Sequence, residues 1–173
     1  KLELDVNFAS PIKVADSSKT NFTVKLTKGK KSYTVNLGSD VKSGKLDNSE
    51  IAYTLEALDY RRNKLSEGAT ELNFYHLTFE NLELGTYSVE ISGDGYQTVT
   101  MDNVEIKKSS KRILVGTDEK NIESEDGTTE HYPAALIGGN FNSDSKVDKT
   151  DYEELKNAIK SKSKDTKFDL NRD

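Results

Sequence analysis

The chain has 173 residues and a mass of 19.3 kDa, enough for one ordinary domain with a small appendage or for two small domains. Its 30 acidic and 25 basic residues are mixed along the sequence, and this net charge of −5 argues against a nucleic-acid or anionic-lipid partner. Cysteine is absent, which excludes disulfides and thiolate metal sites, and no apolar run approaches the roughly 18 residues of a membrane span.

From the start to about Thr117, apolar residues recur at every second position, which is typical of half-buried strands. The clearest runs are Leu2, Leu4, Val6 and Phe8; Phe22, Val24 and Leu26; Tyr33, Val35 and Leu37; Tyr53, Leu55 and Ala57; Tyr75, Leu77 and Phe79; Tyr87, Val89 and Ile91; and Ile113 and Val115. The alternation slips between Met101 and Val104, which predicts a bulge or a break. About eight short strands separated by turn clusters predict a mainly β fold, an antiparallel two-sheet sandwich.

The stretch FENLELGTYSVEISGDGYQTV carries a pattern of large apolar residues and glycines: Phe79, Leu82, Gly85, Tyr87, Gly95 and Tyr96. This pattern is similar to the last hairpin of Cna-B-like and carboxypeptidase-regulatory-like (prealbumin-like) β-sandwiches. The resemblance implies an Ig-like or prealbumin-like sandwich over residues 1–117. Gly85 would permit the tight turn, and Tyr87 would fill the core.

After Thr117 the composition changes. Residues 118–131, DEKNIESEDGTTEH, are acidic and without periodicity, which predicts a linker or a long loop. The third segment, 132–173, opens with the apolar patch YPAALI, which we expect to pack between the sandwich and the rest of the C-terminal segment.

Short oxygen-bearing side chains then alternate in NFNSDSKVDKTD. With Asn140 as position 1, the oxygen donors of an EF-hand loop fall on Asn142 (3), Asp144 (5), the backbone carbonyl of Lys146 (7), Asp148 through water (9) and Asp151 (12). Such a loop aims alternate oxygens at a Ca²⁺ ion. Asn140 and Ser145 replace the usual Asp and Gly of positions 1 and 6, which predicts weakened affinity. The alternative is an Asx-rich surface turn that caps a helix with Thr150 or Asp151.

A short helix is predicted next, because Tyr152, Leu155 and Ile159 stand at i, i+3 and i+7. The chain then reaches DLNRD, in which Asp169, Asn171 and Asp173 reproduce positions 1, 3 and 5 of a second, incomplete loop. The spacing adds these three residues to the expected calcium ligands.

Two such loops separated by one helix resemble the dockerin type I module, over roughly residues 137–173. The resemblance implies an EF-hand-like segment that binds Ca²⁺ and docks to a cohesin domain, as in cellulosomes. Loop positions 10 and 11, here Lys149 and Thr150, would face the cohesin, followed on the helix by Lys156 and Asn157. The alternative for these four residues is ordinary solvated helix surface.

We find no catalytic motif in the sequence, and His76 and His131 are better explained as sheet-surface or loop residues than as bases. We therefore expect a non-enzymatic docking module of a larger secreted bacterial protein, at the cell surface or outside the cell, with the sandwich as an X-module-like companion. Calcium should order the C-terminal segment and hardly change the sandwich. The alternative is an adhesin or carbohydrate-binding sandwich with a calcium-stabilised tail. The Tyr60–Arg62 stretch, YRR, fits either a charged turn or a grip for an anion or a sugar.

Overall fold

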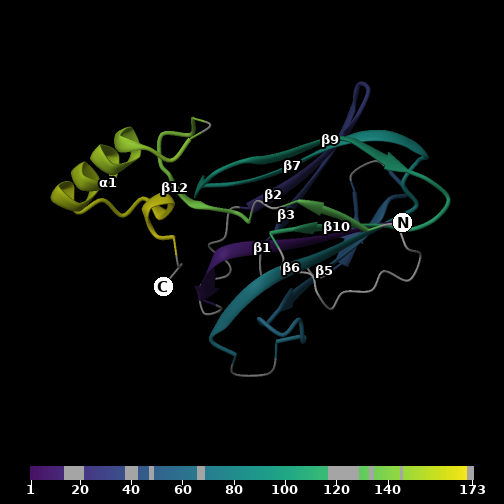
Figure 1. Ribbon diagram of the computed structural model, residues 1–173, viewed down its shortest axis with the longest axis horizontal. Helices are drawn as coiled ribbons and strands as arrows, with labels where there is room; N and C mark the ends of the chain where they lie inside the picture. The colour runs from purple at the N-terminus through teal and green to yellow at the C-terminus, as the bar shows by residue number, and fades with distance from the viewer. Residues whose placement is uncertain are drawn as a thin grey trace.

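The computed structural model describes residues 1–13, 22–37, 43–46, 49–65, 69–116, 129–132, 135–144 and 146–170. In this part of the chain two large β-sheets lie face to face, and a helical segment extends from one end of them (Figure 1). Helix α1 (Lys149–Ser161) lies at the end of the molecule remote from the N-terminus. The mainly β sandwich with a small helical segment predicted from the sequence is confirmed at this level.

One sheet has six strands. From edge to edge these are β11 (Thr129–Tyr132), β10 (Lys111–Val115), β1 (Leu2–Lys13), β6 (Glu71–Glu80), β5 (Ala52–Leu58) and β4 (Ser43–Lys45). Strand β10 runs parallel to both β1 and β11, so this sheet is mixed. The prediction of a purely antiparallel sandwich is therefore wrong for this sheet. Side-chain alternation reports which residues face the core but not the direction of the neighbouring strand, so the sequence pattern could not reveal this.

The position of β11 also differs from expectation. Thr129 to His131 fall within the stretch predicted to be a linker, yet they pair with β10 at the sheet edge. Their polar composition suits an edge strand, which needs fewer apolar neighbours than a central one.

The second sheet is antiparallel throughout. It consists of β3 (Lys31–Leu37), β2 (Phe22–Lys28), β7 (Gly85–Gly93) and β9 (Val99–Ile106). In the pairing of β7 with β9, Tyr87 lies opposite Val104 whereas Val89 lies opposite Met101, which leaves one extra residue on β9. Asn103 adopts a positive φ of 62° at this point. The predicted bulge between Met101 and Val104 is confirmed.

The core lies between the two sheets, where their alternate side chains meet. Leu4, Val24, Leu77 and Val89 are fully buried, and removing such a side chain from water stabilises a fold by about 1.5–3 kcal/mol. At one end an aromatic group packs at centroid distances from 4.7 to 6.1 Å; it consists of Phe8, Phe22, Tyr75 and Tyr96.

The hairpin motif before and within β7 is built as its residues suggest. Gly85 has a φ of 133°, a conformation that other residues rarely adopt, and so it opens β7 after the turn. The hydroxyl of buried Tyr87 donates a hydrogen bond to the Glu83 carbonyl at 3.0 Å. Burial, helped by the charge of Glu83, raises the pKa of Tyr87 to about 12. The hydroxyl therefore stays protonated and keeps the turn tied to the strand.

The chain leaves the sandwich through Leu136, which is fully buried among the core residues. Its N–H donates to the Asn7 carbonyl at 2.9 Å, and its own carbonyl accepts from Ala9 N–H at 3.1 Å. Leu136 of the YPAALI patch is thus part of the sandwich core, whereas Ile137 of the same patch is 44% exposed, so the expected packing between the sandwich and the C-terminal segment is not found at these two residues. The side chains of the first three residues of the patch lie outside the described part. No helix in the described part is long and apolar enough to cross a membrane.

Candidate metal centre

The loop from Asn140 to Asp151 connects a small two-stranded sheet to helix α1. Strand β12 (Gly138–Asn140) pairs antiparallel with β8 (Gly95–Tyr96), and this pairing sets Asn140 opposite Gly95. A side chain at Gly95 would collide with the Lys167 backbone carbonyl, so only glycine fits there. Because β12 pairs with β8, the first residue of the loop, Asn140, is attached directly to the strand that follows β7 of the sandwich.

Asn140 is the position-1 residue, and it is only 3% exposed. Its Nδ2 donates a hydrogen bond to the Asp144 carbonyl, whereas its Oδ1 is buried and finds no hydrogen-bond donor among the described residues. Rotating the amide would set two oxygens against each other, so the orientation follows from the bond to Asp144. A buried acceptor without a partner costs about 1–3 kcal/mol, and a cation beside Oδ1 would remove that cost.

The middle of the loop curls through alternate side chains. Asn142 Oδ1 accepts from Asp144 N–H at 2.9 Å, Asn142 Nδ2 donates to Asp144 Oδ2 at 2.9 Å, and Asp144 Oδ1 accepts from Lys146 N–H at 2.8 Å. These local bonds hold positions 3 and 5 on the same side of the loop. Because a carboxylate has about four lone-pair sites, Asp144 keeps acceptor capacity beyond these two bonds.

Asp148 and Asp151 organise the start of helix α1. Asp148 is the N-cap, with Oδ1 accepting from Thr150 N–H at 2.8 Å, and Asp151 Oδ2 accepts in return from Asp148 N–H at 2.8 Å. Asp151 Oδ1 also accepts from Phe141 N–H at 2.7 Å and Asn142 N–H at 3.2 Å. The helix is therefore capped as in the alternative interpretation, but the cap is Asp148 and neither Thr150 nor Asp151, which were the expected caps. Asp151 instead closes a capping box from the third helical position.

These bonds define what Asp151 can offer to a cation. The backbone N–H of Asp148, followed by those of Phe141 and Asn142, lowers the pKa of Asp151 below its ordinary value, so the group is ionised. With three of about four lone-pair sites engaged, Asp151 has one left for a metal. Asp151 was expected to be the last calcium ligand of the loop. It also has a structural role, because the same carboxylate holds the start of helix α1.

Of the three calcium ligands expected from the second, incomplete loop, the structure describes only Asp169. Asp169 follows the 3₁₀ turn η2 (Thr166–Phe168) and donates its N–H to the Thr166 carbonyl at 3.1 Å, while Asn171 and Asp173 lie outside the described residues. Within the described ranges, no group of three or more His, Asp or Glu side chains is arranged to hold a metal ion. A cation here would depend on the amide oxygens of Asn140 and Asn142 as well as on carboxylates.

The end of the described chain folds back on the loop and on the sandwich. Phe168 packs on Phe141 with ring centroids 4.9 Å apart, and Lys167 Nζ donates to the Phe141 carbonyl at 2.8 Å. The Tyr96 hydroxyl donates to the Leu170 carbonyl at 2.5 Å. The loop is thereby held between β8 and the C-terminal turn.

Helix α1 presents an apolar face to solvent. The predicted stripe is present, but Tyr152 is 60% exposed and Ile159 68% exposed. The helical residues buried in its place are Asp151 and Ala158. Apolar spacing predicted the helix, but the attachment of the loop to β8 decided which side of it faces the protein.

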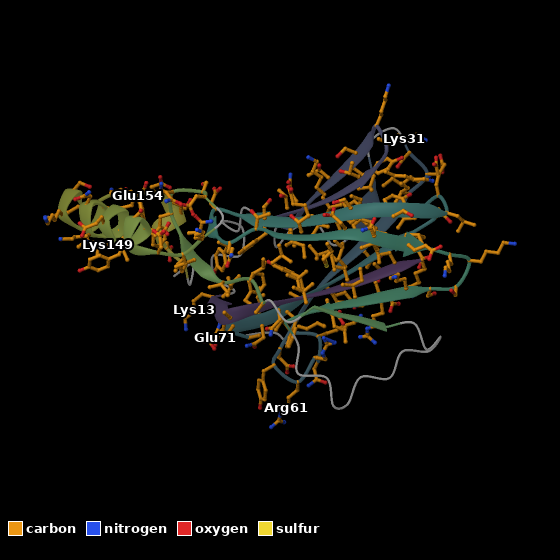
Figure 2. The ribbon with its side chains drawn as sticks, turned by 45° about the horizontal axis from the view of Figure 1, so that its top comes forward. Lys13, Lys31, Arg61, Glu71, Lys149 and Glu154 are labelled. Atoms are coloured by element: carbon orange, nitrogen blue, oxygen red, sulfur yellow. The ribbon has the colours of Figure 1, made fainter. Side chains whose placement is uncertain are left out.

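The expected partner-contacting residues lie on this helix. Lys149, Thr150 and Asn157 are exposed, and Lys149 projects from the start of the helix in Figure 2. Lys156 is partly buried; it pairs with Glu153 at 3.3 Å and lies over the Tyr152 ring at 5.9 Å. Three of the four are thus open to a partner, and the fourth shields an aromatic ring.

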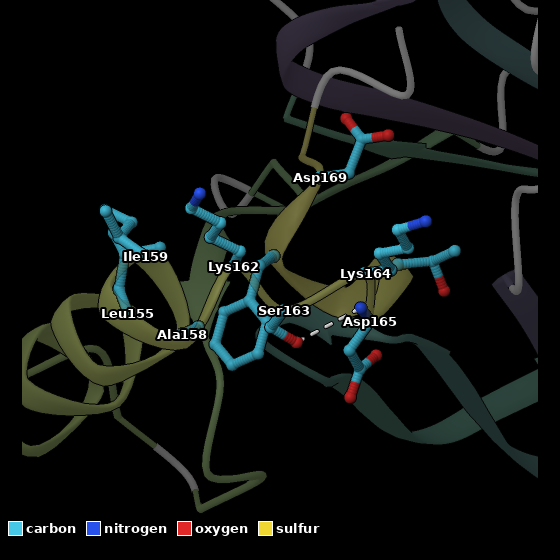
Figure 3. A pocket seen from close by; sticks show the side chains of 10 residues that line it. Leu155, Ala158, Ile159, Lys162, Ser163, Lys164, Asp165 and Asp169 are labelled. Carbon is cyan, nitrogen blue, oxygen red and sulfur yellow. Dashed lines mark hydrogen bonds between the residues drawn. The ribbon is translucent and has the colours of Figure 1, made fainter.

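A groove of about 380 Å³ runs between the end of α1 and the following turn (Figure 3). Apolar Leu155, Ile159 and Phe168 line it, together with Lys162 and Lys164. Sequence reasoning did not identify this groove. The only signal was the repeated lysine spacing of KSKSKD, and a charge pattern cannot reveal that the chain turns back against a helix.

No family model and no curated protein matches the chain. It is similar to two solved structures, a C-terminal and an N-terminal interface mutant of a type II cohesin–X-dockerin complex from Acetivibrio cellulolyticus. The first is 17% identical, with 99% of this chain and 84% of that chain covered and a TM-score of 0.49. The second is 16% identical, with 100% and 86% covered and a TM-score of 0.46. Similarity at this level assigns neither a fold nor a function to the chain.

Proposed function

We propose that this chain is a non-catalytic docking module whose C-terminal segment binds Ca²⁺ and then engages a cohesin-like protein. In this proposal the β-sandwich is a structural companion of the X-module kind, and the module belongs to a larger protein that acts at the cell surface or outside the cell. The proposal rests on the loop from Asn140 to Asp151 and on helix α1, and takes no support from the two similar structures.

The observation that carries the calcium part is the buried, unpartnered Oδ1 of Asn140 at the first loop position. The side-chain atoms available as metal ligands in the loop are oxygens of Asn142, Asp144 and Asp151. Such a set suits a hard cation, which takes six to eight oxygen ligands. Calcium tolerates irregular geometry better than magnesium, which demands a near-ideal octahedron.

The docking part follows from the surface of α1. Tyr152 and Ile159 lie two turns apart on one face, and both are more than half exposed. Lys149 and Lys160 are exposed near them, so the surface is apolar with a basic rim. The matching partner surface would be apolar with acidic residues around it, which is the complementarity that steers and orients protein association.

Titration calorimetry of the whole chain against a panel of cohesin modules tests the proposal. We expect saturable binding in calcium, its loss with a chelator and its return when calcium is restored. Thr150→Arg should abolish binding, whereas Thr34→Arg, an exposed threonine on the remote strand β3, should not. A calcium titration without cohesin measures the metal site separately. If that titration succeeds while no cohesin binds, the partner assignment is wrong and the metal site stands.

A further inference from the structure

A lysine from the C-terminal turn reaches the calcium loop from outside it. The Lys167 ammonium donates a hydrogen bond to the Phe141 carbonyl at 2.8 Å and another to Glu154 Oε2, on helix α1, at 3.2 Å. It also lies over the Phe168 ring, 4.9 Å from the ring centroid. One cation therefore connects the second position of the loop to the helix that follows the loop.

The carbonyl bound by Lys167 belongs to the peptide group between Phe141 and Asn142, which lies between loop positions 1 and 3. The N–H of the same peptide group, contributed by Asn142, donates to Asp151 Oδ1 at 3.2 Å. Because a trans peptide group is planar and its C=O and N–H point in opposite directions, the two bonds fix its orientation from both sides. Without Lys167, only the N–H side of this peptide group would be held.

The turn that carries Lys167 is itself anchored. The Lys167 N–H donates to Asp165 Oδ1 at 3.1 Å at the start of η2, and the Lys167 carbonyl lies close against Gly95 of β8. The Phe168 ring packs on the Phe141 ring. Because these contacts already fix the backbone of the turn, only the side chain of Lys167 has to be ordered for it to hold the loop.

An ammonium group beside a calcium loop has two opposite effects on calcium affinity. Its charge repels Ca²⁺, which by itself would weaken binding. Glu154 offsets part of this charge, and the Lys167 and Glu154 side chains are 30% and 38% exposed, so water and salt screen the rest. The fixed peptide group, in contrast, lowers the cost of ordering the loop when an ion binds. The ordering effect should therefore outweigh the repulsion.

We propose that Lys167 is a positioning residue of the calcium loop, and that it raises calcium affinity by holding the Phe141–Asn142 peptide group in place before the ion binds. This inference rests on the calcium part of the proposed function. It predicts a sign: loss of this positive charge weakens the binding of a cation, whereas a purely electrostatic effect would strengthen it.

Calcium titration calorimetry of the whole chain tests this sign. Lys167→Met keeps the aliphatic stem but removes the ammonium, and we expect calcium to bind about tenfold more weakly, as for the loss of one charged hydrogen bond. Lys164→Met is the matched control, because Lys164 is exposed and its ammonium has no partner among the described residues. Its affinity should stay within about twofold of the unaltered chain. Lys167→Arg keeps the charge and the donors and should restore most of the affinity.

A second measurement needs neither calcium nor a variant. In the unaltered chain with chelator, nuclear magnetic resonance of labelled lysine side chains should show slower proton exchange with water at the Lys167 ammonium than at the Lys164 ammonium. The reason is that the Lys167 ammonium is held by the Phe141 carbonyl and by Glu154. This comparison decides the matter if Lys167→Met fails to fold.

Calcium binding by Lys167→Met that is as tight as in the unaltered chain, or tighter, would overturn the proposal while the calcium site itself stands. Equal weakening by Lys167→Met and Lys164→Met would also overturn it, as would equally fast ammonium exchange at the two lysines. If the unaltered chain binds no calcium, the calcium part of the proposed function is wrong and this proposal falls with it.

Discussion

The β-sandwich and the C-terminal segment from Leu136 to Leu170 differ in what fills their buried positions. Among described residues, Asp5 is the one buried polar residue of the sandwich, whereas the segment buries Asn140 and Asp151 beside only three apolar side chains. Those three are Leu136, Phe141 and Ala158. The segment also leaves Tyr152 and Ile159 in solvent.

The two regions therefore obtain their stability in different ways. The sandwich gains mainly from apolar surface removed from water, which needs no particular partner. A region that buries polar groups is stable only when each is satisfied, and Asn140 Oδ1 has no donor in the described structure. We therefore expect the sandwich to tolerate chelators and the segment to respond to them.

The two regions are nevertheless joined through Leu136, so its truncation should have the largest effect. Leu136→Ala leaves a cavity among the core residues and should lower the free energy of unfolding by about 3 kcal/mol. Urea unfolding followed by circular dichroism measures the change. Leu84→Ala, at a 52% exposed leucine, is the control and should cost less than about 0.5 kcal/mol. A sandwich transition unmoved by Leu136→Ala would mean that the segment is attached without stabilising the core.

The second largest effect on stability should come from calcium binding to the C-terminal segment. At a free concentration one hundred times its dissociation constant, calcium should stabilise the segment by about 2.7 kcal/mol. Asp144→Ala should abolish this gain because it removes a mid-loop carboxylate, Asn142→Ala should only reduce it, and Asp148→Ala should fall between. Thermal melts with calcium or chelator measure the gain, and Asp102→Ala, at an exposed carboxylate on β9, is the control. Normal calcium binding by both Asp144→Ala and Asp151→Ala would refute the loop register.

Asp151 separates the structural role of the loop from its metal role. Because its carboxylate holds three backbone N–H groups, Asp151→Asn should speed amide exchange at Phe141, Asn142 and Asp148 even in chelator. Asp144→Ala should leave the same three amides protected in chelator. Glu153→Gln, on the same helix, is the control for a lost charge. Equal exchange in Asp151→Asn and the unaltered chain would contradict the capping box.

The smallest expected effect is the loss of stability at low pH when Asp5 becomes protonated. Burial disfavours the ionised form of Asp5, but the hydrogen bond from His76 and the charges of Arg62 and Arg112 outweigh burial, so its pKa lies below the ordinary 3.8. A lowered pKa gives stability that is present above 3.8 and is lost as the pH falls through the folded value. Asp5→Asn should therefore flatten the acid limb of a melting-temperature profile recorded from about pH 5 downward. An unchanged acid limb would show that other carboxylates dominate.

Local patterns in the sequence predicted a large part of this architecture. Period-two alternation located the main strands, the slip after Met101 located the bulge, and spacing located α1, because each signal depends on residues only a few positions apart. The oxygen-bearing loop was identified in the same way. Its calcium remains a prediction, as does the cohesin partner.

Long-range contacts decided the rest. Only the tertiary structure sets β10 parallel to β1 and buries Asp5 under two arginines more than 50 positions away from it. Only the pairing of β12 with β8 buries Asn140 and leaves Tyr152 in solvent. Alternation states that a residue faces one side of a strand or helix, but what covers that side depends on segments distant in sequence, and their meeting is a property of the whole fold.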